Sequence, residues 1–249
     1  MVFADNALIK SILRGTSMAS LLPLSEGPNA DYTIIDDLLT GEEHSDLWEY
    51  FLQAPFHRFH EQKLSRIFGI SGPEGLRGPD LLVMRSSHPD SLDNALPPTI
   101  SRLADHILQS EATQQFLNSC ECWNQMSLQP YIYPTGAGLT WHLDNGRAAA
   151  FIYYAHPIWY LNWGGELLVG PRSFVQSSGP VAQAFSVFDR LCNPFDTSSL
   201  LDTTGAHCVF PKPNRLVLIR GGAPHTIKKV EASAGNAFRA SVAGFFSQR

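Results

Sequence analysis

The sequence lacks several features that mark particular classes of protein. No apolar run approaches the roughly 18–20 residues that a membrane-spanning helix needs, and only 16% of the residues are charged. There is no basic run, and the net charge is −5, so composition gives no electrostatic basis for binding nucleic acid or an anionic membrane. We therefore expect neither a nucleic-acid partner nor a membrane partner.

Cysteine is also scarce. The four cysteines are Cys120, Cys122, Cys192 and Cys208, and their spacing matches no zinc site, because one residue between Cys120 and Cys122 is too short a spacer and no second pair follows. The sequence shows no secretory signal. We therefore expect free thiols, a reducing compartment and a cytoplasmic location.

What the chain does have is the composition of an ordinary globular protein with a sizeable core, since 44% of its 249 residues are hydrophobic. We predict one domain over residues 1–249, acting as a monomer or a homodimer. Within it, residues 1–30 form an N-terminal extension, residues 31–122 a helical support region and residues 123–249 a β core.

The first half of the chain is predicted to hold the helices. Thr40 and Glu43 have the spacing of a capping box for a helix over 41–52. Two more helices are expected over 99–109 and 112–117. The remaining expectations for this half are a short N-terminal helix over 7–14, strands over 31–36 and 81–85, and a Gly-rich loop over 56–79 that is either a substrate lid or a solvated excursion.

From Trp123 onward the sequence consists of short β-rich runs separated by Gly, Pro, Asn or Asp. Many short strands with such punctuation are typical of a sandwich or barrel. We therefore predict a mostly β (α+β) fold with supporting N-terminal helices. The predicted strands cover 125–133, 139–143, 148–155, 165–169, 184–188, 207–210, 215–220, 225–230 and 237–246.

Three residues of this half are candidates for a metal site. His142 and Asp144, two residues apart, point to the same side of an extended segment, and His225 begins a strand after a Gly- and Pro-containing turn. Two histidines and one carboxylate are the ligand set of non-haem Fe(II) sites that activate oxygen. The alternative is that the histidines are structural residues held by hydrogen bonds, because a lone His-x-Asp recurs by chance.

A candidate anion site lies further along the chain. Arg239 and Ser241 share one face of an alternating strand, and a buried arginine is costly unless it pairs with an anion. Its forked guanidinium suits a carboxylate, and a hydroxyl two residues away adds a hydrogen bond. A salt bridge to a carboxylate of the protein itself is the alternative.

Together these motifs resemble a known family over roughly residues 125–246. The ordered set of His142-Leu-Asp144, Gly164-Gly-Glu-Leu167, His225 and Arg239-Ala-Ser241 is similar to that of the Fe(II)/2-oxoglutarate-dependent dioxygenases, in their prolyl-4-hydroxylase-like branch. Two departures leave the substrate mouth undefined: the gap between His225 and Arg239 is wider than in many members, and Asp189–Lys212 is an insertion. The matching stretches also include Tyr133–Gly138, Ala150–Tyr154, Asn214–Ile219 and His225–Val230.

The resemblance implies a double-stranded β-helix (jelly-roll) core with a metal site near one mouth. It makes His142, Asp144 and His225 the iron ligands. The same resemblance assigns Arg239, assisted by Ser241, to the distal carboxylate of 2-oxoglutarate. Tyr154 would bind that same carboxylate and Tyr133 would lie near the chelating end of the cosubstrate, although core packing is the alternative for both tyrosines.

The implied activity consumes O2 and 2-oxoglutarate, with ascorbate as a stimulant, and releases succinate and CO2 while oxidising an unactivated C–H bond. Hydroxylation, desaturation and ring closure are all within the family's reach. Related halogenases carry a small residue at the position of Asp144, so the aspartate argues against halogenation.

We expect the substrate to be a small molecule, such as an amino acid or an intermediate of natural-product biosynthesis. Hydroxylation of prolyl or other residues in proteins is the alternative, and a cupin-like metal enzyme or a binding module is the alternative of another class. Arg239 with Tyr154 argues against the cupin-like enzyme, which needs no clamp for a dicarboxylate. Loss of a metal ligand would favour the binding module, and none is lost. Candidates to line the substrate mouth, with packing or exposure as the alternative for each, are Trp141, Asn145, Arg147, Trp159 and Trp163.

Overall fold

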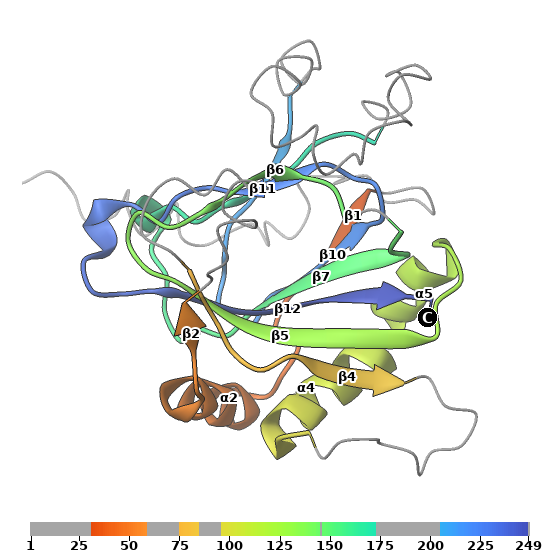
Figure 1. The fold of residues 1–249 in the computed structure, drawn as a ribbon, viewed down its shortest axis with the longest axis horizontal. Helices are drawn as coiled ribbons and strands as arrows, with labels where there is room; N and C mark the ends of the chain where they lie inside the picture. The colour runs from red at the N-terminus through yellow and green to blue at the C-terminus, as the bar shows by residue number, and fades with distance from the viewer. Residues whose placement is uncertain (1–30, 59–74, 85–95, 145, 173–204, 249) are drawn as a thin grey trace, which may run out of the picture. The chain divides into compact units, whose positions relative to one another are not determined.

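The computed structural model consists of two antiparallel sheets with helices packed against the larger one (Figure 1). It describes residues 31–58, 75–84, 96–144, 146–172 and 205–248, and residues 31–249 form one compact unit. In chain order the elements are β1 (Tyr32–Ile35), α2 (Gly41–Gln53), β2 (His57–Arg58), β3 (Leu76–Arg77), β4 (Leu81–Met84), α4 (Pro98–Gln109), α5 (Glu111–Asn118), β5 (Gln125–Tyr133), β6 (Leu139–His142), β7 (Ala149–Tyr154), η1 (Leu161–Trp163), β8 (Leu167–Val169), β9 (His207–Val209), β10 (Leu216–Arg220), β11 (His225–Ile227), η4 (Ala232–Ala234) and β12 (Arg239–Ser247).

Strand β12 lies in the middle of the larger sheet. The strand order is β1-β10-β7-β12-β5-β3-β2, and β4 also pairs with β5. On one edge of β12, Arg239 is opposite Tyr133 of β5, and on the other edge Ser241 is opposite Tyr154 of β7. Residues that are far apart in the sequence are therefore neighbours here.

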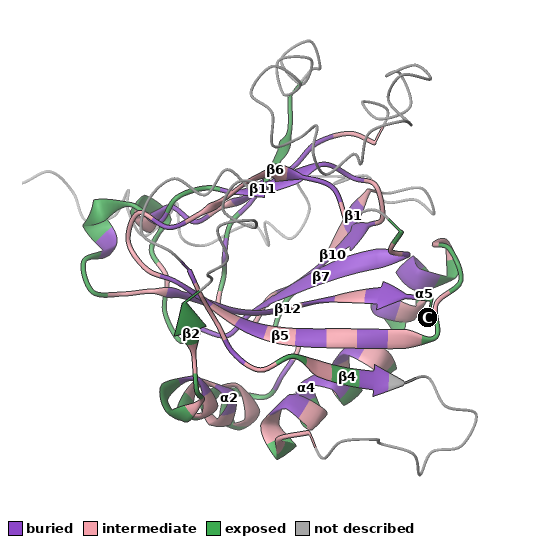
Figure 2. Cartoon of the chain, viewed as in Figure 1, coloured by how far each residue is buried: buried purple, intermediate pink, exposed green. Residues whose placement is uncertain are grey.

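The two faces of the larger sheet pack against different layers, because side chains alternate along each strand. On β12, Ala240, Val242 and Phe246 belong to a hydrophobic cluster that includes Leu103 and Ile107 of helix α4. The opposite face contributes to a second cluster, shared with strands β8, β9 and β11 of the smaller sheet. Figure 2 shows that β7 and β10, which take part in both clusters, are buried along their length.

The helices follow from local sequence signals. At the start of α2 the Thr40 hydroxyl accepts a hydrogen bond from the Glu43 amide at 3.3 Å, and the Glu43 carboxylate accepts one from the Thr40 amide at 2.9 Å. Helix α4 buries Ile100, Leu103 and Ile107, whose spacing places them on one face. Within the described residues, every helix is too short or too polar to cross a lipid bilayer.

The smaller sheet has the order β6-β11-β8-β9 and carries the two candidate metal histidines. His225, the first residue of β11, is opposite His142 at the end of β6 and opposite Val169 of β8 on its other edge. The turn before β8 holds Gly164 and Gly165 at φ 69° and 74°, a conformation that favours glycine.

The predicted mostly β fold with N-terminal helices is confirmed, and so is the capping box of α2. Several predicted strands are shorter than expected, two of them next to the candidate site. The strand predicted over 165–169 begins at Leu167 because the two glycines before it are not extended, and the strand predicted over 225–230 ends at Ile227. Short strands β2 and β3 lie at the two ends of the predicted loop over 56–79.

Some predictions fall outside the described residues. They are the helix in the extension 1–30, residues 59–74 of the Gly-rich loop, the strand over 184–188, residues 189–204 of the insertion, and Asn145. The division into a support region and a core stays a prediction. Cys120, Cys122 and Cys208 carry free thiols, as expected.

Candidate active site

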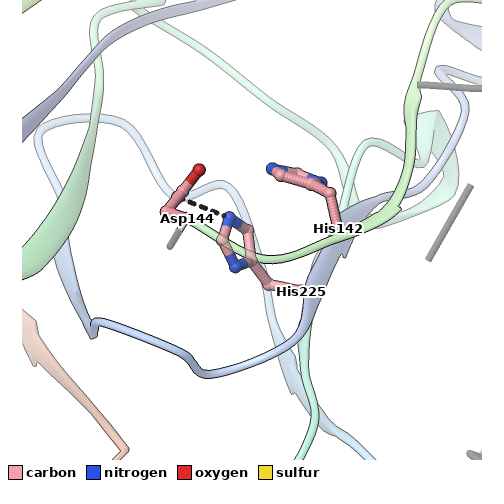
Figure 3. Close-up of side chains that lie close together, drawn as sticks. All are labelled: His142, Asp144 and His225. Atoms are coloured by element: carbon pink, nitrogen blue, oxygen red, sulfur yellow. Dashed lines mark ion pairs between the residues drawn. The ribbon is translucent and has the colours of Figure 1, made fainter. Parts of the chain in front are cut away.

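Three side chains meet at the end of the smaller sheet, as Figure 3 shows. Cross-strand pairing brings the rings of His142 and His225 together, with centroids 4.2 Å apart. Asp144, two residues after the end of β6, places Oδ2 3.2 Å from Nε2 of His225. The three ligand atoms lie within 4.8 Å of one another, close enough to hold one metal ion.

Backbone carbonyls orient both imidazole rings. Nδ1 of His142 lies 2.8 Å from the Thr140 carbonyl, and Nδ1 of His225 lies 2.9 Å from the Ala223 carbonyl. A carbonyl only accepts, so Nδ1 carries the proton in the neutral rings and Nε2 keeps its lone pair. This outer hydrogen bond is the usual support of a metal-bound histidine.

The charges of the three groups are strongly coupled. Burial, with the charge of His225, lowers the pKa of His142 to about 4. Burial also acts to lower the pKa of His225, but the charge and hydrogen bond of Asp144 outweigh it and raise that pKa. Burial acts to raise the pKa of Asp144, whereas the neighbouring His225, His142 and Arg147 hold it below its usual range. The site is therefore built to accept a cation.

Arg239 is fully buried between two tyrosine rings. Its guanidinium carbon lies 4.8 Å from the ring centre of Tyr154 and 5.4 Å from that of Tyr133. Nε donates to the Gly165 carbonyl at 3.0 Å, and Nη1 donates to the Ser241 hydroxyl at 3.2 Å. The guanidinium plane is therefore fixed by two hydrogen bonds within the protein.

Two buried polar atoms at this place have no protein partner. Among the described residues, neither Nη2 of Arg239 nor the Tyr154 hydroxyl has a partner with hydrogen-bond geometry, although the Arg239 guanidinium lies close enough to that hydroxyl to act against the rise of its pKa. Burial raises the pKa of Tyr154, so its hydroxyl keeps its proton and can donate. Native proteins rarely leave such groups unpaired, because each unpaired group costs about 1–3 kcal/mol. An anion with carboxylate geometry satisfies both atoms.

The Gly164-Gly165 turn explains how Arg239 is held. A β-carbon on Gly165 would lie 3.0 Å from Cδ of Arg239, so only glycine leaves room for the arginine at this approach. The Trp159 indole donates to the Gly164 carbonyl at 2.9 Å and packs at a tilt of 40° against His156, with ring centres 4.7 Å apart. Trp159 therefore supports the turn that orients Arg239.

A mostly apolar cavity leads to the three candidate ligands. Tyr133 and Ser241, which contact Arg239, line it, and so do Tyr131 and Phe245. The remaining lining residues are Leu139, His142, Asp144, Ala150, Phe151, Ile152, Ile219, His225, Ile227, Ala243 and Gly244.

The residues predicted for the substrate mouth lie elsewhere or are not described. The cavity lining does not include Trp141, Arg147, Trp159 or Trp163, and Asn145 lies outside the described residues. Trp163 packs edge-on against Trp159, with ring centres 5.2 Å apart. Their contact with a substrate stays a prediction.

Sequence reasoning missed several residues that shape the site. Tyr131 and Phe245 line the cavity, and the Gly165 carbonyl orients Arg239. The alternation along Arg239, Ser241 and Phe245 was a usable signal for Phe245, because every second residue of a strand shares a face. The sequence holds no such signal for the hydrogen bond between Trp159 and the Gly164 carbonyl, because that bond depends on how the turn folds.

Comparison with known proteins identifies the family. Residues 128–247 match the family model of the 2OG-Fe(II) oxygenase superfamily. No curated protein sequence matches the chain.

Three solved structures share the fold. A prolyl-4-hydroxylase from Pseudomonas putida is 16% identical with a TM-score of 0.52, and the match covers 88% of this chain and 93% of that one. HygX from Streptomyces hygroscopicus, solved with nickel and 2-oxoglutarate bound, is 12% identical with a TM-score of 0.53, covering 87% and 83%. SnoN, a non-heme alpha ketoglutarate dependent epimerase from nogalamycin biosynthesis, is 12% identical with a TM-score of 0.54, covering 88% and 76%. The family match and the fold identify the chain, through residues 128–247, as a 2-oxoglutarate-dependent dioxygenase of the 2OG-Fe(II) oxygenase superfamily, with Fe(II) and 2-oxoglutarate as its cofactors.

Proposed function

We propose that the enzyme oxidises an unactivated C–H bond of a small molecule, and that His142, Asp144 and His225 hold its iron. The observation that carries the proposal is the pair of unpartnered donors, Arg239 Nη2 and the Tyr154 hydroxyl, beside a three-ligand metal site. A metal enzyme that uses only water, or a binding module that has lost its chemistry, has no use for this buried carboxylate clamp.

The metal site fits iron by the chemistry of its donors. Two imidazole nitrogens and one carboxylate form three points of a ligand set, which leaves positions open for exogenous ligands. Nε2 of His225 lies 3.2 Å from the Asp144 oxygen, and a bound metal ion would take the place of the proton that these two groups share. Asp144 fills the position that a halide would need, so we expect no halogenation.

The anion site fits 2-oxoglutarate. Arg239 and Tyr154 would bind the distal carboxylate, while Ser241 and the Gly165 carbonyl keep the guanidinium in place. Tyr133, whose ring lies against Arg239 and whose side chain lines the cavity, would border the cosubstrate on the side of the metal. No carboxylate of the described residues is bonded to Arg239, so the salt bridge that was the alternative is not formed there.

When bound, Fe(II) and 2-oxoglutarate supply the activation of O2 that oxidises the substrate, with release of succinate and CO2. The protein positions the two groups and keeps the reaction space dry. Aliphatic side chains, among them Ile152, Ile219 and Ile227, form the cavity walls, and an apolar wall excludes water that would compete with the substrate. The rigid backing of Arg239 holds the cosubstrate in one orientation.

The shape of the cavity supports a small-molecule substrate. It lies between the two sheets and its walls are mostly aliphatic and aromatic, which suits a compact molecule with apolar C–H bonds. Fold relatives include a prolyl-4-hydroxylase as well as HygX and SnoN, so hydroxylation of a protein residue is the second candidate. Succinate release driven by a proline-containing peptide, with no response to small molecules, would favour the second candidate.

Anaerobic titration tests the proposal. Fe(II) and 2-oxoglutarate added to the full chain are expected to produce the weak visible charge-transfer band of an iron-chelated 2-oxoacid. Arg239→Ala should weaken 2-oxoglutarate binding by at least about tenfold, because a charge-assisted pair is lost. Arg102→Gln, which removes an arginine of α4 that pairs with Asp46 of α2, is the matched control and should change nothing. If no band forms, or if Arg239→Ala binds as tightly as the native chain, the proposal is wrong.

A second test addresses the ligands. His142→Ala and Asp144→Ala should abolish succinate formation, whereas Cys120→Ser should retain it. Succinate formation by Asp144→Ala at the native rate would rule out the assigned role of the aspartate.

A further inference from the structure

A cationic side chain lies near each end of the inner face of strand β12. Arg239, Ser241, Ala243 and Phe245 alternate along this face, and the last three line the cavity. Arg239 occupies the buried end. At the other end, the guanidinium carbon of Arg147 lies 5.1 Å from the centre of the Phe245 ring. A second cation therefore lies beside the cavity, away from the cosubstrate clamp.

The two arginines are too far apart to bind one 2-oxoglutarate molecule. Arg239 and Phe245 are six positions apart on a paired strand, which corresponds to roughly 20 Å at about 3.3 Å per residue. That length exceeds the reach of the cosubstrate, whose distal carboxylate has its partners at Arg239 and Tyr154. Arg147 is thus available for a different anion.

The backbone around Arg147 is firmly placed. The next residue, Ala148, donates its amide to the Phe246 carbonyl at 2.8 Å and accepts from the Gly221 amide at 3.1 Å. Gly221 approaches the Arg147 carbonyl so closely that a β-carbon at Gly221 would overlap it. The start of this side chain is therefore fixed between β12 and the turn that follows β10.

Its charged end makes no contact ion pair with a described carboxylate, although its charge acts on Asp144 from further away and helps to lower the pKa of that carboxyl. Arg147 is half-buried, stacks on Phe245 and forms no ion pair with a described carboxylate. A guanidinium stacked on an aromatic ring keeps its forked edge free for a planar anion. Three other arginines of the described part do form such ion pairs: Arg102 with Asp46, Arg172 with Asp31, and Arg215 with Asp36.

We propose that Arg147 binds a carboxylate of the substrate, and that the enzyme therefore acts on carboxylate-bearing small molecules. The apolar body of such a substrate would pack against Phe245 and Tyr131, with the C–H bond to be oxidised toward His142, Asp144 and His225. This inference rests on the proposed function and adds the substrate class to it. If Arg147 only covers Phe245, acids and their neutral analogues bind alike.

The test compares matched neutral and anionic probes. The full chain is loaded with Ni(II), which keeps the site catalytically silent, and with 2-oxoglutarate. N-acetyl amino acids and phenylalkanoic acids are then titrated calorimetrically, each beside its own primary amide. We expect acids to bind about tenfold more tightly than their amides, as a charge-assisted hydrogen bond provides.

Three variants test whether Arg147 causes the preference for acids over their amides. Arg147→Gln should remove it, Arg147→Lys should keep a smaller one, and the control Arg102→Gln should keep all of it. Binding of 2-oxoglutarate by Arg147→Gln shows that a lost preference does not come from unfolding. A panel in which no acid binds better than its amide, or a preference that survives Arg147→Gln, overturns the inference.

The outcome also separates this inference from the function on which it rests. If the native chain forms no charge-transfer band with Fe(II) and 2-oxoglutarate, the proposed function fails, and the inference fails with it. If the band forms and the amides bind as well as the acids, only the assignment of Arg147 is wrong.

Discussion

Each residue of the candidate site is held by a partner that does no chemistry itself. The carbonyls of Thr140 and Ala223 orient the two histidines, and the Gly165 carbonyl orients Arg239. Such supporting contacts fix a catalytic group to within a fraction of an ångström, which is the precision that positioning requires. A change in a supporting residue should therefore appear in binding before it appears in stability.

Trp159 provides a direct test of this support. Trp159→Phe removes the hydrogen bond to the Gly164 carbonyl and keeps an aromatic ring, so the turn that orients Arg239 should loosen. One net hydrogen bond is worth about 1 kcal/mol, and 2-oxoglutarate affinity should fall about fivefold while Ni(II) affinity is unchanged. Trp163→Phe, at a neighbouring ring without that bond, is the matched control. Equal effects of the two substitutions would contradict the role of Trp159.

Removal of the metal should also be measurable at this scale. His225 and Asp144 face each other at 3.2 Å, and a bound metal ion would be held by both. Ni(II) at about 100 times its Kd should add about 2.7 kcal/mol of stability, and EDTA should remove it. Thermal unfolding with and without EDTA measures the effect. His225→Ala should show no such difference, and a full response in that variant would argue for a metal site elsewhere.

At the scale of elements, helix α2 shows why local patterns are predictable from sequence. Thr40 and Glu43 satisfy each other's amides within one turn, so the signal and the structure span the same few residues. Strand β12 was also recognised, because Arg239 and Ser241 alternate with apolar residues. Its pairing with both β5 and β7 was not predictable, since neighbours in a sheet are chosen by the whole chain.

The capping box of α2 predicts a pH dependence. The Thr40 amide, followed by His106 and the Thr40 hydroxyl, lowers the pKa of Glu43 from 4.5 to about 2. A carboxyl with a depressed folded pKa stabilises the protein above its unfolded pKa, and this contribution is lost as the pH falls through the folded value. The destabilisation caused by Glu43→Gln, measured by urea unfolding, should therefore be larger at pH 6 than at pH 3. Glu42→Gln makes the same charge change in the same turn and should show a weaker pH dependence.

At the scale of the whole molecule, His156 connects parts of the chain that are distant in sequence. Its ring nitrogens lie 2.8 Å from the Pro211 carbonyl and 3.1 Å from the Ala240 carbonyl, and its ring packs against Tyr154 and Trp159. The sequence around His156 does not predict these two contacts, because both carbonyls belong to segments that are remote in the sequence. Buried polar links of this kind are the part of the fold that periodicity does not reveal.

The global stability should reflect the titration of His156. Burial lowers its pKa from 6.5 to about 3, although the Pro211 carbonyl acts to raise it. The unfolded chain therefore binds a proton at higher pH than the folded one, and stability present above pH 6.5 is lost as the pH falls toward 3. One such proton contributes a slope of about 1.4 kcal/mol per pH unit. In urea unfolding with Ni(II) bound, His156→Gln should flatten this slope, and the exposed His57→Gln should leave it unchanged.

Strand β12 has a consequence for the size of substrate that the enzyme accepts. Because β5 and β7 pair with it on both edges, β12 cannot slide, and a slip of one residue would turn Arg239 toward the helices. The distance along the strand between the cosubstrate clamp at Arg239 and Phe245 is therefore fixed. Of the two inward side chains between Arg239 and Phe245, Ser241 supports the clamp, so selectivity for substrate length would be set at Ala243, where a larger residue shortens the available space without moving either end.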